Sequence, residues 1–240
     1  MSHFYIYPKN IINNTFTMES EQLHYVVNVR RFAVDDEIKL FDGLGNGFLG
    51  KITKISKEKL SGIILNKQTF IKPSVEIYLY CAIAKGERTE WLIEKTAEIG
   101  ITKFIPLITK RSVITSFSPN KYERLNKISI SASCQCGRAD IMEIEKPLAF
   151  ENALKSSITE KTLSILAWES EDKQTIDDIY NKNINIKRIN IFIGPEGGFE
   201  PNEIELAKNN NFHTITLGKN ILRIETAAIT AAVLISNKWI

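Results

Sequence analysis

Two glycine turns near the C-terminus decide the fold. Residues 191–204 read I-F-I-G-P-E-G-G-F-E-P-N-E-I, and residues 214–227 read T-I-T-L-G-K-N-I-L-R-I-E-T-A. The short β-branched run before the first turn, residues 189–193, suits a buried strand. Pro201 suits the first position of a helix and Glu203 its first turn, so a helix should follow the loop. The order strand, glycine loop, helix is typical of a site for a nucleotide-like ligand.

The chemistry of the first loop narrows the class of ligand. Gly194, Gly197 and Gly198 permit positive φ and a close approach to the backbone, but their spacing is neither G-x-x-x-x-G-K-[ST] nor G-x-G-x-x-G. Glu196 would repel a pyrophosphate and tolerate a cation. S-adenosylmethionine, an adenosine that carries a sulfonium, therefore fits better than NAD or ATP. A tight turn with a solvated Glu196 explains the loop equally well.

Upstream of these turns, strand-like and helix-like segments alternate. Residues 75–84 form a continuous apolar run, residues 87–99 a helical pattern ended by Gly100, and residues 103–108 a second strand. The other expected elements are a helix at residues 121–136, strands at residues 163–168, 189–193 and 214–217, and an alanine-rich helix at residues 225–236. This alternation predicts a mainly parallel α/β sheet.

The N-terminal part has a different pattern. E-I-K-L-F at residues 37–41 alternates, Asp42-Gly43 is a turn signal, and residues 47–55 and 60–65 read as further strands. Residues 20–31 look helical. A small β-barrel over residues 1–70 fits this pattern. Residues 66–74, with Pro73, form a plausible linker to a second domain at residues 75–240.

The composition points away from several classes of protein. The 240 residues are 43% hydrophobic and 25% charged, and the net charge of +3 permits nucleic-acid binding without predicting it. No apolar run is long enough for a membrane span, and the first residues do not read as a secretory signal. The three cysteines favour reduced thiols in the cytoplasm, since Cys134 and Cys136 have neither a second pair nor a nearby histidine for a metal site.

The two glycine motifs, in this order, resemble the ribosomal RNA small subunit methyltransferase E family. The motifs are G-P-E-G-G-F at residues 194–199 and L-G-K-N-I-L-R-I-E-T-A at residues 217–227. K-G-E-R-T-E-W-L-I-E-K-T-A-E-I-G at residues 85–100 and S-C-Q-C-G-R at residues 133–138 are similar to further motifs of that family. L-H-Y-V-V-N-V-R at residues 23–30 is similar to part of its N-terminal domain.

This resemblance implies a fold and an activity. The implied fold is α/β, with a C-terminal SPOUT methyltransferase domain that contains a deep trefoil knot and a small N-terminal PUA-like RNA-binding β-barrel. The implied activity is S-adenosylmethionine-dependent methylation of N3 of a uridine in 16S rRNA of the small ribosomal subunit. The protein is expected to be a cytoplasmic homodimer that needs no membrane and no metal.

The resemblance also implies where the cofactor binds. Backbone groups of the two glycine loops would hold the adenine and the ribose over an apolar floor. The expected cofactor-binding residues are Leu166, Ile193, Gly194, Pro195, Glu196, Gly197, Gly198, Leu217, Gly218, Ile221, Leu222 and Thr226.

Methylation of N3 also requires that this nitrogen lose its proton. N3 of uridine is a weakly acidic N–H, so a carboxylate could take its proton or a cation could stabilise the resulting anion. The candidate catalytic residues are Arg138, Glu196, Arg223 and Glu225. Glu225 has an alternative role at the start of the last helix, where a carboxylate favours the helix dipole. Arg138 is expected to anchor the RNA phosphate or the uridine.

Cations along the chain are the candidate RNA contacts. Arg88 and Lys95 share a helix face with Leu92 and Ile99, and the pattern predicts cations toward the RNA with the aliphatic side chains inward. The full set is His24, Arg30, Arg31, Lys85, Arg88, Lys95, Lys110, Arg111 and Arg138. A solvated surface with a purely solubilising role is the alternative for the helix and barrel residues.

The chain departs from the family pattern at several positions. Asn220 stands where arginine is usual and Cys134 where glutamate is common, and His3, Asp35 and Ile224 also differ. Two alternatives therefore stay open: a SPOUT enzyme with another RNA target, and an RNA-binding ribosome assembly factor without catalysis. A phosphate-binding Rossmann enzyme would bind NAD or ATP, and Glu196 argues against it.

Overall fold

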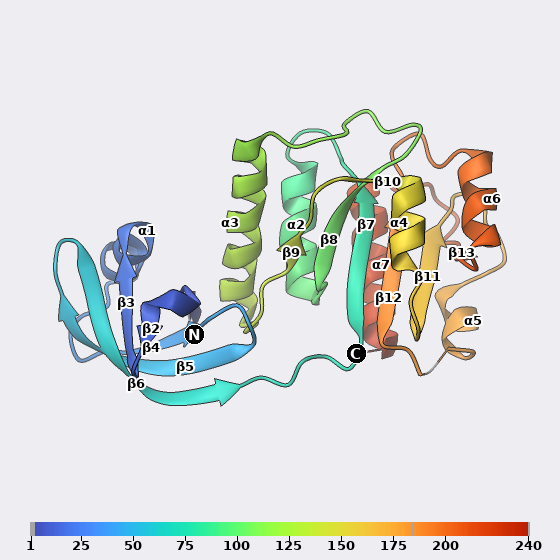
Figure 1. The fold of residues 1–240 in the computed structure, drawn as a ribbon. Coiled ribbons are helices and arrows are strands. Elements are labelled where there is room, and N and C mark those ends of the chain that lie inside the picture. The colour runs from blue at the N-terminus through green and yellow to red at the C-terminus, as the bar shows by residue number, and fades with distance from the viewer. Residues whose placement is uncertain (1–2, 184, 240) are drawn as a thin grey trace. The chain divides into compact units, whose positions relative to one another are not determined.

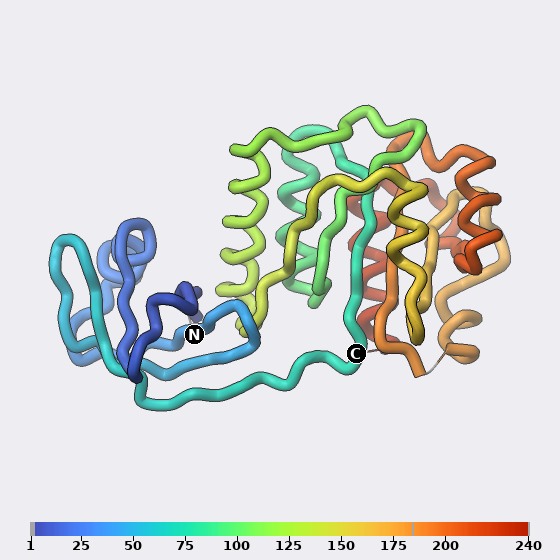
Figure 2. Tube along the Cα trace, in the orientation of Figure 1, coloured from blue at the N-terminus to red at the C-terminus, as the bar shows by residue number. Residues whose placement is uncertain are grey.

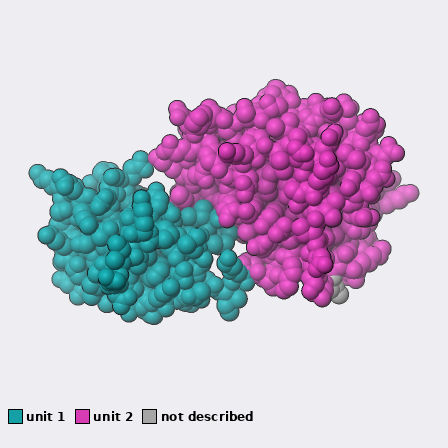
Figure 3. Space-filling model, in the orientation of Figure 1, with its two compact units in different colours: residues 1–72, 133–141 teal, residues 73–132, 142–240 magenta. Residues whose placement is uncertain are grey.

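The chain divides into two compact units. The computed structural model describes residues 3–183 and 185–239. One unit comprises residues 1–72 and 133–141, and the other comprises residues 73–132 and 142–240 (Figure 3). The first division falls within the expected linker. Residues 133–141 also belong to the first unit. No feature of the sequence indicates this, and they were predicted to be part of the second domain.

The first unit is built on a six-stranded sheet in the order β1-β4-β5-β6-β3-β2. The strands are β1 (His3–Tyr5), β2 (Ile11–Ile12), β3 (Thr15–Glu19), β4 (Glu37–Phe41), β5 (Asn46–Ile55) and β6 (Lys59–Thr69). β1 runs parallel to β4, and the other neighbours are antiparallel. The predicted helical insertion forms α1 (Ser20–His24) and a π-helical turn (Tyr25–Val29). Phe16, Met18 and Leu40 lie in the core of this unit.

The second unit contains a parallel sheet in the order β10-β8-β7-β12-β11-β13, with β9 paired to β8. Its strands are β7 (Glu76–Ala82), β8 (Lys103–Ile108), β9 (Glu143–Ile144), β10 (Leu148–Ala149), β11 (Thr162–Ala167), β12 (Arg188–Ile193) and β13 (His213–Ile215). Its helices are α2 (Arg88–Ile99), α3 (Pro119–Cys136), α4 (Phe150–Ser157), α5 (Ile176–Tyr180), α6 (Pro201–Asn209) and α7 (Ile224–Trp239). The last four residues of α3 count with the first unit.

Helices cover both faces of this sheet (Figure 1). On one face, apolar side chains of α2, α3, α5 and α7 pack against Ile77, Leu79 and Ile191. On the other face, α4 and α6 pack against Tyr80 and Phe192, whose rings stack at 4.4 Å between centroids. Burial on both faces explains why the strands read as continuous apolar runs rather than alternating ones.

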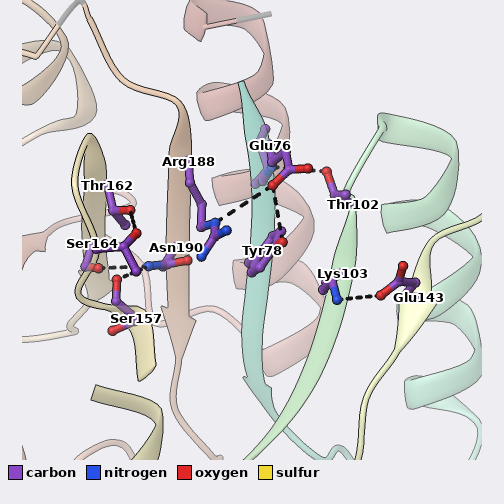
Figure 4. Close-up of polar contacts among 12 residues, drawn as sticks. Glu76, Tyr78, Thr102, Lys103, Glu143, Ser157, Thr162, Ser164, Arg188 and Asn190 are labelled. Atoms are coloured by element: carbon purple, nitrogen blue, oxygen red, sulfur yellow. Dashed lines mark hydrogen bonds and ion pairs between the residues drawn. The ribbon is translucent and has the colours of Figure 1, made fainter. Parts of the chain in front are cut away.

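Polar side chains gather at the amino-terminal ends of the strands, on the face that carries α4 (Figure 4). Tyr78, Asn190 and Ser164 occupy one register row of β7, β12 and β11. The buried Asn190 Nδ2 donates to Ser157 O (2.9 Å) and Ser164 Oγ (3.1 Å). The Arg188 guanidinium lies 4.4 Å from the centroid of the Tyr78 ring. These contacts tie the strands together at one end of the sheet and leave the carboxyl ends to the loops.

Most expected elements of the second unit are present. β8 has the predicted bounds, and α2, α3, α7 and the strands β7, β11 and β12 match within three residues at each end. The helices α4 and α5 were not predicted. In Figure 2 the connection from β8 to α3 crosses the carboxyl ends of the strands, where functional loops of parallel sheets are found.

Candidate functional site

A cavity of about 400 Å³ lies at the carboxyl ends of β11, β12 and β13. Three loops form its walls, at residues 167–169, 193–199 and 216–224, and the helix α7 adds Ala227. Its volume falls within the ~300–1,000 Å³ of ordinary small-molecule sites. The two glycine motifs, distant in sequence, therefore line one cavity.

The first glycine loop is held in place by specific contacts. Gly198 has φ +69°, a conformation that L side chains rarely adopt, and its N–H donates to Pro195 O (2.9 Å). A Cβ at Gly198 would lie 2.3 Å from Glu169 Oε1. Glycine is therefore required here both by backbone conformation and by the close approach of the loop after β11.

Two residues that follow β8, Lys110 and Arg111, contact the first glycine loop and the helix after it. Arg111 Nη1 donates to Gly197 O (2.6 Å), and a Cβ on Gly197 would lie 3.3 Å from the Arg111 side chain. The buried Glu203 carboxylate accepts the N–H of Lys110 (3.0 Å) and the N–H of Glu200 (2.9 Å). The loop after β8 and the start of α6 are thus joined through one carboxylate.

The second glycine loop is held by hydrogen bonds of Thr216 and Gly218. The Gly218 N–H donates to the Thr216 hydroxyl oxygen (3.2 Å), and the Thr216 N–H donates to Gln174 O (3.0 Å). Gly218 has φ +123°, and a Cβ there would meet nothing within 4 Å. Its backbone is therefore open to a ligand in the cavity.

A second, more open recess of about 650 Å³ adjoins the cavity. Residues 221–223 line both, so this segment is the wall between them. The recess is also lined by Arg88 and the half-exposed Trp91 from α2, and by Glu225 and Thr226 from α7. With Glu87, the lining holds an indole ring, two cations and two carboxylates, which suit a planar polar ligand.

The carboxylate of Glu225 is buried and incompletely paired. Its Oε1 lies 3.9 Å from Arg88 Nε, and its Oε2 has no hydrogen-bond partner among the residues that the structure describes. Burial, followed by the negative charges of Glu225 and Glu196, raises the pKa of the Cys81 thiol far above its usual value. The thiol at the end of β7 is thus protonated and unreactive at neutral pH.

Ten of the twelve predicted cofactor-binding residues line the main cavity, and two do not. Leu166 is fully buried on the face of α4 and α6, one position before Ala167, which does line the cavity. Thr226 lines the adjoining recess. The ten in the cavity are Ile193, Gly194, Pro195, Glu196, Gly197, Gly198, Leu217, Gly218, Ile221 and Leu222.

The prediction also missed lining residues. Trp168 and Glu169 lie in the loop after β11, which the family resemblance implies as part of the ligand site, but neither residue was named. Lys219 and Asn220 lie within a motif that was recognised, between residues that were named. Trp91 lay within the quoted 85–100 motif but was not assigned a role.

The predicted cations of the second unit have different surroundings. Arg88 and Arg223 line the recess beside Glu225, whereas Lys85 and Lys110 are exposed outside both cavities. Lys95 is held by Glu94 Oε1 (2.7 Å) and Glu98 Oε1 (3.0 Å). Two carboxylates at this distance neutralise the ammonium, so Lys95 is poorly placed for a phosphate contact.

The predicted RNA contacts of the first unit also differ in exposure. Arg138 is largely buried and forms a two-point pair with Asp140, with Nε–Oδ1 at 3.1 Å and Nη2–Oδ2 at 2.8 Å. Burial alone would raise the pKa of Asp140, but the hydrogen bonds and charge of Arg138 outweigh it and lower that pKa. His24, Arg30 and Arg31 are exposed at and after α1.

Two other kinds of feature are absent from residues 3–183 and 185–239. No group of three or more His, Cys, Asp or Glu side chains lies together as a metal site requires. No helix in that part of the chain is long and apolar enough to cross a membrane.

Comparison with known proteins covers almost the whole chain. Residues 72–236 match a family described as RNA methyltransferase domain, and residues 19–65 match one described as RNA methyltransferase PUA domain. A ribosomal RNA small subunit methyltransferase E of Rickettsia conorii is 36% identical over 234 residues, 96% of this chain and 93% of that protein. The protein of the same name from Synechocystis is 31% identical and covers 93% of this chain and 73% of its own length.

Solved structures share the complete fold. A ribosomal RNA small subunit methyltransferase E from Neisseria gonorrhoeae, bound to S-adenosyl methionine, is 27% identical with a TM-score of 0.87, covering 100% of this chain and 98% of its own. A putative methyltransferase from Legionella pneumophila with bound S-adenosylmethionine is 27% identical with a TM-score of 0.86, covering 99% and 97%. The predicted fold class, a knotted SPOUT domain with a PUA-like barrel, is confirmed.

Proposed function

Because this chain belongs to the ribosomal RNA small subunit methyltransferase E family, we propose that it methylates N3 of a uridine in 16S rRNA, with S-adenosylmethionine as methyl donor. The observation that carries this proposal is the cavity of about 400 Å³ that both glycine motifs line. Both the donor and the acceptor atom are part of the proposal.

The residues of the cavity fit S-adenosylmethionine. Ala167, Ile193 and Leu217 offer apolar surface for an adenine, and the open backbone at Gly218 offers polar groups to its edges or to the ribose. Glu169 and Glu196 place two carboxylates in a lining that also holds Lys219 and Arg223, and a carboxylate near the sulfur favours a cationic sulfonium. When bound, S-adenosylmethionine supplies an electrophilic methyl group on sulfur.

The adjoining recess fits the acceptor. Trp91 offers a ring against which a uracil could stack, and Arg88 and Arg223 offer positive charge to the uracil oxygens. The Glu225 carboxylate, which lines this recess, would accept the N3 proton, leaving the nitrogen lone pair free to form the new bond. Residues 221–223 stand between the two cavities, so they would position the donor and the acceptor against each other.

The partners follow from the same proposal. The substrate is 16S rRNA or the small ribosomal subunit, the working form is a homodimer, and the compartment is the cytoplasm. Arg138 would serve RNA only by exchanging its pair with Asp140 for a phosphate, so its anchoring role stays a prediction.

A transfer assay with three substrates tests this function. Small ribosomal subunits, large ribosomal subunits and tRNA, all from cells that lack this protein, are incubated with labelled S-adenosylmethionine. We expect label in the small subunit alone. Label in tRNA or the large subunit would support S-adenosylmethionine as the methyl donor but contradict 16S rRNA as the substrate. No label in any RNA, with no calorimetric binding of S-adenosylmethionine, would favour an assembly factor without catalysis.

A further inference from the structure

A third recess, of about 330 Å³, lies on the sheet of the first unit. Its lining includes His3 from β1, Lys39 from β4, Gly47 from β5, and Asn66 and Gln68 from β6. Phe70, just after β6, forms one side. None of the RNA contacts predicted from the sequence lies in it.

The strand register brings these side chains onto one face. His3 pairs with Lys39, Lys39 with Leu49, and Leu49 with Asn66, which makes one row across four strands. Gly47 pairs with Gln68 two residues along, so both lie on the same face as the row. The intervening Phe4 and Leu40 point to the core. The recess is therefore a feature of the outer face of the sheet.

Phe70 is held against this face by a glycine. A Cβ at Gly47 would lie 2.6 Å from the Phe70 ring, so only the absence of a side chain at Gly47 lets the ring rest on β5. Phe70 N donates to Gly45 O (2.9 Å), which anchors the residue after the strand has ended. The ring stays 39% exposed. An aromatic ring that is fixed at its base and open on one side is a platform for stacking.

The polar groups of the recess are available to a ligand. Across the two described stretches of the chain, neither the Asn66 nor the Gln68 side chain makes a hydrogen bond within the protein, so each amide presents a donor and an acceptor. His3 Nε2 donates to Leu40 O (3.0 Å), and burial lowers the pKa of the imidazole. The neutral ring keeps Nδ1 as an acceptor. Lys39 is the one charged side chain in the described lining, and no carboxylate is part of it.

We propose that this recess binds one unstacked nucleobase of single-stranded RNA. The base stacks on Phe70, its polar edge meets the amides of Asn66 and Gln68, and Lys39 faces an adjoining phosphate. Recognition of RNA by splayed-out bases uses this combination of aromatic ring, amide and cation. A base-paired duplex presents no free base to such a recess. The inference rests on the proposed function only in taking RNA as the ligand.

Binding of short RNA tests the proposal without any need for methyl transfer. The probe is a fluorescently labelled, mixed-sequence RNA octamer, single-stranded or annealed to its complement, and the readout is anisotropy with the full chain. Phe70→Ala should weaken single-strand binding by roughly 5- to 100-fold, the range for loss of one stacked base. Phe70→Tyr should restore it, and Phe70→Leu should not. The matched control is Ile71→Ala at the neighbouring, 99% exposed position, which should bind as the wild type does.

Three further measurements make the outcome decisive. An octamer with 5-iodouridine should cross-link to the β5–β6 face, with Phe70 in the labelled peptide. Affinity for S-adenosylmethionine should be unchanged in Phe70→Ala, since Phe70 and the cofactor cavity belong to separate units. If methyl transfer occurs, KM for RNA should rise while kcat at saturating RNA stays the same. Equal octamer affinity of Phe70→Ala and wild type, or equal loss in Ile71→Ala, would overturn the proposal. Absence of methyl transfer by wild type would overturn the proposed function alone.

Discussion

Arg88 and Glu225 form an unequal pair, in which Arg88 Nε lies 3.9 Å from Glu225 Oε1 while Glu225 Oε2 is buried with no partner among the described residues. Leaving a buried carboxylate oxygen unpaired costs free energy, on the order of 1–3 kcal/mol. A fold carries such a cost where the group serves another purpose. Because Glu225 also lines the recess of Trp91, we propose that its carboxylate accepts a proton from the substrate.

Glu225→Gln should separate stability from activity. Because a neutral amide is cheaper to bury than a carboxylate, the free energy of unfolding should stay equal or rise by about 1 kcal/mol. Methyl transfer should fall by about 100-fold or more, as expected for loss of a general base. Chemical denaturation and single-turnover transfer measure the two quantities. Glu205→Gln, on the exposed face of α6, is the matched control and should change neither. Full activity in Glu225→Gln would assign Glu225 to the helix terminus alone.

Gly198→Ala and Gly197→Ala should differ, although the glycines are adjacent. Alanine at Gly198 must adopt φ +69° and meets Glu169 Oε1, whereas at Gly197 it meets only the flexible Arg111 side chain at 3.3 Å. We expect Gly198→Ala to lose about 1–2 kcal/mol of stability and about tenfold in affinity for S-adenosylmethionine, measured by calorimetry. Gly197→Ala should lose less of both. Equal affinities in the two variants would show that the loop conformation does not shape the site.

Asn190→Ala should damage the fold and spare the site. The substitution leaves Ser157 O and Ser164 Oγ without their donor and opens a small void in a fully buried position (Figure 4). We expect a loss of about 2–4 kcal/mol in the free energy of unfolding by urea. Affinity for S-adenosylmethionine should be unchanged well below the melting temperature, because Asn190 lies at the amino ends of the strands. A weaker affinity for S-adenosylmethionine, measured where Asn190→Ala is fully folded, would contradict this separation of the two ends of the sheet.

Cys81 should make the fold less stable in alkali. The pKa of its thiol is raised by burial and by two carboxylates, so the folded state keeps a proton that the unfolded state loses above about pH 8.5. Stability from this group is fully present below that pH and declines as the pH rises. The melting temperature of the wild type should thus fall more steeply from pH 8 to pH 10 than that of Cys81→Ala. Parallel curves for the two proteins would refute this contribution.

The strands and the cavity could be predicted because their signals are local. β8 reads as an apolar run bounded by Gly100 and a cationic pair, and the structure gives it the predicted limits. The glycine motifs are local in sequence, and ten of the twelve residues predicted to bind the cofactor line one cavity. Leu166 missed the cavity by one residue, since successive strand residues face opposite sides and the end of β11 could not be fixed to that accuracy.

The rest depends on contacts between distant residues. Arg111 supports Gly197 from a position 86 residues earlier, and the sequence offered only its charge, which suggested RNA. Arg138 likewise read as a free cation, although the fold pairs it with Asp140. The recess at Phe70 depends on the register of four strands, and no pattern within one strand shows it. Side-chain partners of this kind become visible only once the fold is known.

The most direct test of the central claim identifies the methylated atom. Small ribosomal subunits from cells lacking this protein are incubated with S-adenosylmethionine, with and without the protein, and the 16S rRNA is digested to nucleosides for mass spectrometry. The account predicts 3-methyluridine that appears only in the sample with protein and that falls sharply with Glu225→Gln. A different methylated nucleoside, or no new one, would contradict the assignment of uridine N3 as the acceptor.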